Sequence, residues 1–271
     1  MIRRSILDVD YDSKLGFPNQ YNATPFTIIL KIFLNPMKPE HGHHLGHIRD
    51  DEKQVFAFQA WKDHEWATYK KEFKRDAEKY LNWPRMKLFI LPQARTDRQS
   101  QIQLKYFEHP HPLKKYFVPY VQCGISIQLL DSKAGSHASF DVMRQRDGDP
   151  DFRSFDHQNR HGRDTGKLTN RDVDKWAAPP ADGVPQNSVS HELGHVLGLD
   201  HSNESDPKCQ QSDGNAHICY GKPGTPEYLD LMGNGNRVSE ADAPPWRKRI
   251  PMHAHGLDWR ITTLRPDMID I

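Results

Sequence analysis

The sequence predicts an α+β domain in which helices pack on a twisted mixed sheet. An apolar run rich in β-forming residues, TPFTIILKIFLN, fills positions 24–35. Residues 51–81 then place apolar side chains mostly three or four positions apart, with charged residues between them, which indicates a long amphipathic helix. Shorter apolar runs follow before a helix with histidines at 191 and 195. This order is typical of helices packed on a sheet.

The remaining elements follow in order along the chain. The runs expected as strands are MKLFILP at 86–92, VPYVQCGISIQLL at 118–130 and SHASFDVMR at 136–144, the last at a sheet edge. The segments expected as loops are PMKPEHGHHLGHIRDD at 36–51, which has no periodicity, and the Gly-, Asp- and Pro-rich stretch from 144 to 185. The chain has no internal repeat, and we expect one domain over residues 1–271.

Composition argues against two classes of partner. The 37 basic and 36 acidic residues nearly cancel, and a net charge of +1 gives no field that would select nucleic acid or an anionic membrane. No apolar stretch has the length of a transmembrane helix, and the start, MIRRSILDVDYDSKLGF, lacks the apolar run of a signal peptide. If the protein leaves its cell, we expect a route other than an N-terminal signal.

The three cysteines are too few for a disulfide framework. Cys209 and Cys219 lie ten residues apart in one polar loop, where a bridge and two free thiols are equally open. Cys123 lies in an apolar run and is expected to be a buried thiol.

The most informative stretch is HELGHVLGLDH, residues 191–201. On a helix His191 and His195 stack on one face, so both imidazoles can reach one ion at about 2.0–2.1 Å. An unbroken helix would carry His201 about 15 Å along the axis from His191, beyond the reach of a shared ion. Gly198 resolves this, because glycine tolerates the left-handed conformation that ends a helix and reverses the chain. His201 is therefore expected to return as the third ligand.

The ligand set indicates the chemistry. Three neutral imidazoles leave one tetrahedral position open for water, which is the arrangement of a catalytic zinc site. Zinc lowers the pKa of such a water towards about 7, and a nearby carboxylate can take its proton. Glu192 lies about 100° around the helix from His191, a poor position for ligation but a suitable one for reaching the water. The stretch thus predicts Zn²⁺ bound by His191, His195 and His201, with Glu192 as general base.

HELGHVLGLDH fits the HExxHxxGxxH signature at every fixed position, and the chain therefore resembles the metzincin zinc peptidases. That clan places a methionine turn beneath the metal, and YLDLMGNGNRV puts Met232 in a Gly- and Asn-rich turn 31 residues after His201. The resemblance implies a zincin-like fold with a long N-terminal helix and an active-site helix at about 186–198. It assigns residues 1–200 to the sheet and active-site helix, and residues 201–271 to a small C-terminal subdomain with the methionine turn.

The resemblance implies a zinc-dependent endopeptidase that acts on protein or peptide substrates. Glu192 would activate the attacking water, whereas Met232 and Gly198 would have structural roles. Two alternatives stay open: a zinc amidase acting on cell-wall peptides, because the ligands would be the same, and a non-catalytic, zinc-stabilised binding module. The presence of Glu192 favours an enzyme, since a purely structural zinc site does not need this carboxylate.

A narrower resemblance concerns delivery. The stretch DLMGNGNRVSEADAPPWRKRI, in a chain that starts without a signal peptide, is similar to metzincin-like effector domains that bacteria deliver by type VI secretion. This similarity implies a toxin that is secreted or delivered without an N-terminal signal and acts in the target-cell periplasm. It also implies a secretion-spike protein and an immunity protein as partners.

The residue that would stabilise the oxyanion is open. Several metzincin branches use a tyrosine shortly after the methionine, but no tyrosine follows Met232 in this chain. Tyr228, His253 and His255 are candidates by chain proximity, and simple packing or solvation is the competing interpretation of each. Asp200 is expected as a turn residue or as a hydrogen-bond partner of a ligand, and not as a ligand itself, because three histidines already fill the protein positions around the ion.

Two further clusters have an ordinary interpretation beside a functional one. The loop histidines His41, His43, His44 and His47 could bind a second transition metal, although histidine-rich polar loops are usually solvated. The aromatic residues Trp61, Trp66, Tyr69 and Phe73 could stack nucleic-acid bases. Their helical spacing and the near-neutral charge favour core packing instead.

Overall fold

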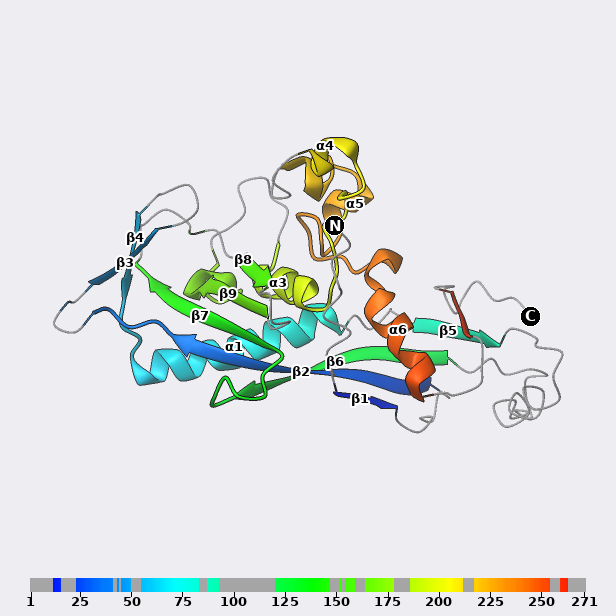
Figure 1. Ribbon diagram of the computed structural model, residues 1–271, viewed down its shortest axis with the longest axis horizontal. Coiled ribbons are helices and arrows are strands. Elements are labelled where there is room, and N and C mark those ends of the chain that lie inside the picture. Colours follow the sequence, from blue (N-terminus) through cyan, green and yellow to red (C-terminus); the bar gives the residue numbers. More distant parts are fainter. Residues whose placement is uncertain are drawn as a thin grey trace. The chain divides into compact units, whose positions relative to one another are not determined.

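The computed structural model forms two compact units (Figure 1). The residues that it describes are 12–15, 23–40, 43, 45–49, 55–82, 87–92, 120–146, 152, 155–158, 164–177, 186–211, 217–253 and 259–262. Unit 1 holds Leu30–Leu81 and Ile127–Val238, and unit 2 holds Asp12–Ile29, Asn82–Ser126 and Ser239–Ile271. The expectation of one domain with subdomains 1–200 and 201–271 stays a prediction.

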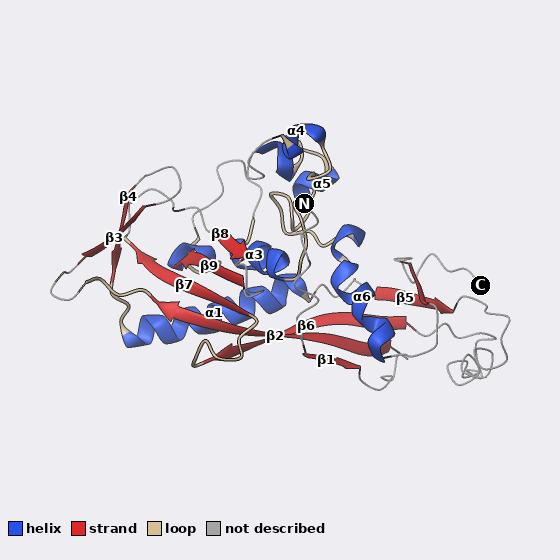
Figure 2. Ribbon diagram, in the orientation of Figure 1, coloured by secondary structure: helices blue, strands red, loops and turns tan. Residues whose placement is uncertain are grey.

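The strands of unit 1 form a mixed sheet. They are the C-terminal part of β2 (Ala23–Pro36), β3 (Leu45–Arg49), β4 (Val55–Gln59), β7 (Ala138–Gln145), β8 (Phe155–Gln158) and β9 (Asp164–Thr169). β7 pairs in parallel with β2 and β9 and lies between them (Figure 2). The pairs β4–β7, β3–β4 and β8–β9 are antiparallel. A mixed sheet with helices confirms the predicted α+β class.

The prediction that residues 136–144 form an edge strand is wrong. β7 has partners on both sides, and its side chains are buried on both faces. Phe140 and Val142 point to one face, and Ser139 and Met143 to the other, with all four buried. The polar residues in the run suggested a solvated face, but the position of a strand in a sheet depends on partners far away in sequence.

The predicted helix at 51–81 is wrong over its first part, where β4 lies. Phe56 and Phe58 are two positions apart and buried, which is the period of a strand, although Phe58 also fits a helical step towards Trp61. β3 lies within the segment expected as a loop, and it pairs with β4 so that the Phe58 ring covers Gly46. A hairpin therefore precedes the helix.

The expected loop from 144 to 185 is also wrong in part, because β8, β9 and the short 3₁₀ helix η2 (Asn170–Asp172) lie there. The sequence of β9, DTGKLT, is mostly polar, and Leu168 is its buried large apolar side chain. Pairing with β7 along the whole strand places it in the sheet despite this composition. Tertiary pairing thus overrides a weak local preference.

Two helices of unit 1 pack against each other, as Figure 1 shows: α1 (Asp63–Leu81) and α3 (Ser188–Val196). Tyr69, Phe73 and Ala77 of α1 are fully buried, as are Val189 and Leu193 of α3. The aromatic residues Tyr69 and Phe73 therefore pack in the core. No helix in the described part of the chain is long and apolar enough to cross a membrane.

Unit 2 combines strands with a C-terminal helix. Its elements are β1 (Asp12–Leu15), the N-terminal part of β2, β5 (Lys87–Pro92), most of β6 (Tyr120–Leu130), η4 (Glu240–Asp242), α6 (Pro244–His253) and β10 (Trp259–Thr262). The pairs β1–β2, β5–β6 and β5–β10 are antiparallel. The Trp246 indole on α6 is buried and donates to Gly124 O at 3.0 Å. Cys123 is a free, buried thiol, as predicted.

A polar network joins α1 to the start of α3. Asp76, fully buried on α1, accepts a hydrogen bond from Asp174 N at 2.8 Å. The Asp174 carboxylate in turn accepts from Asn187 Nδ2 at 2.9 Å, and Asn187 caps α3. Lys79 Nζ and Tyr80 Oη also donate to Asp174, at 3.1 and 3.0 Å. The Asp174 carboxylate thus binds Asn187, which begins α3, and also Lys79 and Tyr80 of α1.

We predict that Asp174→Asn destabilises the fold at neutral pH and not in acid. Partial burial alone would raise the pKa of this carboxyl, but the hydrogen bonds from Asn187, Lys79 and Tyr80 outweigh that effect and hold the pKa below its ordinary value. A lowered pKa means that the ionised group stabilises the fold above its ordinary pKa, and that this contribution disappears as the pH falls through the lowered value. Because Asp174 is exposed and its charge is screened by water, urea unfolding should show a loss of about 0.5–1 kcal/mol at pH 7 that narrows as the pH falls below about 4. A difference in unfolding free energy between the native protein and Asp174→Asn that does not change with pH would contradict this explanation.

Candidate metal centre

The start of α3 is fixed by side-chain and backbone contacts. Asn187 Oδ1 accepts from Ser190 N at 2.9 Å, as a helix N-cap does, and Asn187 N donates to Asn236 Oδ1 at 2.7 Å. The Gln186 amide donates to Gly233 O at 2.7 Å. The N-terminus of α3 is therefore tied to the segment around Gly233, which lies far away in sequence.

The end of α3 reverses the chain. Gly198 has a φ of 85°, in the left-handed region, and Leu197 is the C-cap. Gly198 N donates to His195 O at 2.8 Å, and Leu199 N donates to Gly194 O at 3.0 Å. These are the two bonds of a Schellman motif, in which glycine takes the left-handed position. The chain leaves the helix here and brings His201 back beside it.

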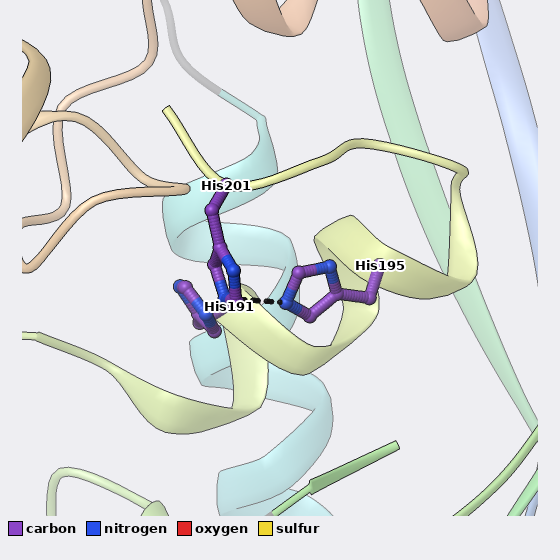
Figure 3. A group of neighbouring side chains, drawn as sticks. All are labelled: His191, His195 and His201. Carbon is purple, nitrogen blue, oxygen red and sulfur yellow. Dashed lines mark hydrogen bonds between the residues drawn. The ribbon is translucent and has the colours of Figure 1, made fainter. Parts of the chain in front are cut away.

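Three imidazoles converge at this reversal (Figure 3). One ring nitrogen of each of His191, His195 and His201 lies within 4.8 Å of the others. His195 Nε2 and His201 Nε2 are 3.1 Å apart. His191 is buried, and the other two are half-buried. Within the described residues, this is the group of side chains that could hold a metal ion.

Backbone carbonyls orient the two helical histidines. His191 Nδ1 lies 2.8 Å from Leu231 O, and His195 Nδ1 lies 2.9 Å from Leu199 O. A carbonyl only accepts, which favours a proton on Nδ1 and a lone pair on Nε2 of both rings. At His191 the Gln186 side-chain nitrogen also lies 3.1 Å from Nδ1, but the Leu231 carbonyl is closer. In metal-binding histidines, the ring nitrogen that does not bind the metal usually donates such a hydrogen bond, which fixes the tautomer.

The arrangement fits a tetrahedral ion. Two nitrogens at zinc distances and a tetrahedral angle would be about 3.3 Å apart, close to the 3.1 Å between His195 Nε2 and His201 Nε2. The Nδ1 protons on carbonyls leave Nε2 as the donor atom of the helical pair. Imidazole nitrogens suit Zn²⁺ as well as copper, iron and nickel, so the geometry alone does not choose between these metals.

The turn of residues 230–237 packs against α3. Leu231 supplies the carbonyl for His191, and Met232 O accepts from Ser202 N at 3.0 Å, next to His201. The Met232 side chain is buried, and a Cβ built on Gly194 would lie 2.3 Å from its sulfur. The thioether therefore packs directly on the bare backbone of the helix, between the two helical histidines in sequence.

A disulfide joins Cys209 of α4 (Pro207–Gln210) to Cys219 of η3 (His217–Tyr220), which resolves the open alternative in favour of a bridge. Asn203 N donates to Cys219 O at 2.9 Å, and Asn203 Nδ2 donates to Ile218 O at 2.7 Å. The bridged loop is thus bound to the segment that follows His201.

The general base predicted from sequence lies on the same helix. The Glu192 side chain is buried, with 7% exposed, and follows His191 in α3. Asp200 is exposed in the turn before His201. The catalytic role of Glu192 stays a prediction, as do the ligand roles of the histidines.

Of the other candidates, Tyr228 has a partner within the turn, and the rest are exposed or outside the description. Tyr228 of α5 (Pro226–Leu229) is buried, and its hydroxyl accepts from Asn234 Nδ2 at 2.7 Å, which is a bracing contact within the turn. His253 ends α6, where its side chain is not described, and His255 lies outside the described residues. In the histidine-rich segment, His43 and His47 are exposed, and His41 and His44 lie outside the described residues.

Three residues of the site were not predicted: Gln186, Gly194 and Tyr220. Gln186 and Tyr220 carry no signal in the sequence, because their contacts come from chain segments that only folding brings together. Gly194 does carry one, since a glycine inside a helix costs about 0.5–1 kcal/mol relative to alanine and suggests a close neighbour.

We predict that the effect of Gly194→Ala on stability depends on Met232. In the native background the new methyl group displaces the thioether, and overpacking should cost about 1–3 kcal/mol. In a Met232→Ala background the same change should stabilise by about 0.5–1 kcal/mol, because only the gain in helix preference is left. Urea unfolding of the four proteins, with a chelator present, measures this coupling. If Gly194→Ala changed the free energy of unfolding in the same direction in both backgrounds, steric contact between position 194 and Met232 would not explain its effect.

None of the protein-family models, curated proteins or solved structures compared with this chain matches it. The assignment therefore depends on the residues themselves. They form an α+β fold in which three histidines converge at the end of one helix, in a cluster that could hold a metal ion.

Proposed function

We propose that the chain is a zinc-dependent endopeptidase of the metzincin type. The observation that carries the proposal is the convergence of His191, His195 and His201, with the Nδ1 protons of the helical pair held by carbonyls. The HExxHxxGxxH pattern and the packing of Met232 on α3 support it. Zinc is the metal that most often combines three histidines with an open position.

The residues divide the chemistry between them. His191, His195 and His201 would hold the ion, which when bound polarises the scissile carbonyl and lowers the pKa of the attacking water. Glu192 takes the proton from that water and delivers it to the leaving nitrogen. Its carboxylate is buried on the helix that carries two of the histidines, so its orientation is limited before substrate arrives.

A strand beside α3 supports cleavage within a chain. β8 lies in contact with α3 and, in the described part of the chain, pairs with β9 alone. An extended peptide could add to its other edge through backbone hydrogen bonds. Such pairing would bind a segment within a chain and would not need a chain end, which favours an endopeptidase.

The same residues are compatible with two other functions. A zinc amidase acting on cell-wall peptides would use the same ligands and base, and only its substrate would differ. A zinc-stabilised binding module would not need the Glu192 carboxylate. We propose further that the protein is a secreted bacterial effector that acts in the target-cell periplasm, with a spike protein and an immunity protein as partners; the similarity of DLMGNGNRVSEADAPPWRKRI to such effector domains supports this.

We predict one zinc ion per chain, removed by changes at the three histidines. His191→Ala should abolish most binding, because two imidazoles and water make a much weaker site. His43→Ala, at an exposed histidine, is the matched control and should keep full zinc content. Elemental analysis after dialysis measures this. Full zinc content in the variant with alanine at positions 191, 195 and 201 would disprove the site.

Glu192→Ala should abolish proteolysis and keep zinc. All three histidines remain, while the loss of a group that serves both proton transfers should lower kcat by about 10²–10⁴ or more. Glu40→Ala, at an exposed loop position, is the control and should cleave like the native protein. Cleavage of mixed protein substrates, with and without a chelator, measures activity. In cells, a periplasmic Glu192→Ala protein as toxic as the native one would show that harm comes from binding.

A further inference from the structure

An aromatic ring packs on the histidine cluster. The Tyr220 ring centroid lies 4.2 Å from that of His201, with the ring planes 41° apart. It lies 5.6 Å from the His191 ring, at 20°. The distance to His191 is in the range of about 4.5–7 Å at which aromatic rings attract each other beyond simple burial, and the contact with His201 is slightly closer. Tyr220 is thus part of the wall of the cluster.

The position of this ring is fixed by its own segment. Tyr220 directly follows Cys219, which the disulfide joins to Cys209. The carbonyls of Ile218 and Cys219 accept hydrogen bonds from Asn203, two residues after His201. On the other side, Gly221 has a φ of 93° and packs so closely on Tyr228 N that a Cβ would lie 2.9 Å from it. The segment that carries the ring is therefore held at both ends.

The third histidine lies outside the helix. His191 and His195 are on α3, whereas His201 lies on the non-helical chain after the reversal, where the Tyr220 ring packs on it more closely than on His191. Packing of a flat ring on an imidazole limits rotation about the side-chain bonds, and an imidazole that is already oriented loses less entropy when it binds a metal.

We propose that Tyr220 is a positioning residue for the metal site, which fixes the plane of the His201 imidazole through its aromatic ring and not through its hydroxyl. The inference depends on the proposed zinc site. It also gives the Cys209–Cys219 bridge a function, because the bridge holds the segment from which the ring projects.

The test compares zinc affinity in full-chain variants by competition with a chelator. Tyr220→Leu removes the ring and should weaken zinc binding by about 10–100-fold, the range for residues that orient metal ligands. Tyr220→Phe keeps the ring and should bind zinc like the native protein. Trp66→Leu, which removes a half-buried aromatic ring on α1 that lies outside the contacts of the cluster, is the control and should bind zinc like the native protein. The visible spectrum of the Co²⁺-loaded proteins should change for Tyr220→Leu and stay native for Tyr220→Phe.

A second pair of variants guards against a folding defect. Cys209→Ser with Cys219→Ser leaves Tyr220 in place but releases its segment, and should also weaken zinc binding. When the two serine changes are combined with Tyr220→Leu, zinc binding should be little weaker than in Tyr220→Leu alone, because both changes act through the same ring. Thermal unfolding of the metal-free proteins identifies any variant that has lost its fold.

Each outcome has a distinct meaning. A native protein that binds no zinc would overturn the proposed function itself. Native zinc binding with unchanged affinity in Tyr220→Leu would overturn the role of Tyr220 alone. Weak binding in Tyr220→Phe would show that the hydroxyl is the group that acts, and fully additive losses would show that the bridge acts elsewhere. Either result would overturn the inference.

Discussion

The candidate site depends on which ring nitrogen of each helical histidine carries the proton. A neutral imidazole binds a metal only through the nitrogen that lacks a hydrogen, and the carbonyls of Leu231 and Leu199 favour the tautomers of His191 and His195 that carry this hydrogen on Nδ1. Both acceptors are backbone atoms. Their positions follow from the path of the chain, which at Leu199 depends on the left-handed Gly198. A change that moves either carbonyl would alter metal binding without touching a histidine.

The other carbonyl depends on the close packing of the 230–237 turn. A Cβ on Gly233 would lie 2.1 Å from Glu227 O, and one on Gly235 would lie 2.1 Å from Leu229 O. Both neighbours are backbone atoms of α5, which cannot give way as a flexible side chain can. Any larger residue would push the turn away from α5 and shift Leu231. The glycines therefore serve the site through the backbone, although they lie far from the histidines in sequence.

The parts of the site that could be predicted are those whose chemistry imposes a local spacing. His191 and His195 must lie one helical turn apart, and His201 can return only past a glycine, so HELGHVLGLDH holds that information by itself. Strand order could not be predicted in the same way. β7 is interior because β2 and β9 flank it. The sequence predicts helix where β4 lies because Phe58 is one helical step before Trp61, and the strand period from Phe56 to Phe58 is too short to outweigh that pattern. Contacts such as Tyr220 on His201 depend on the same distant pairing of segments.

The burial of Glu192 bears on what the site is for. Removing a carboxylate from water costs several kcal/mol unless partners compensate it, so a buried Glu is a burden in a helix whose purpose is only to hold histidines. Leu193 and Val196 show that the same helix buries apolar side chains without that cost. A structural metal site would do as well with alanine or leucine at position 192. Beside the proposed zinc ion a carboxylate would serve proton transfer, and for this reason we propose an enzyme and not a binding module.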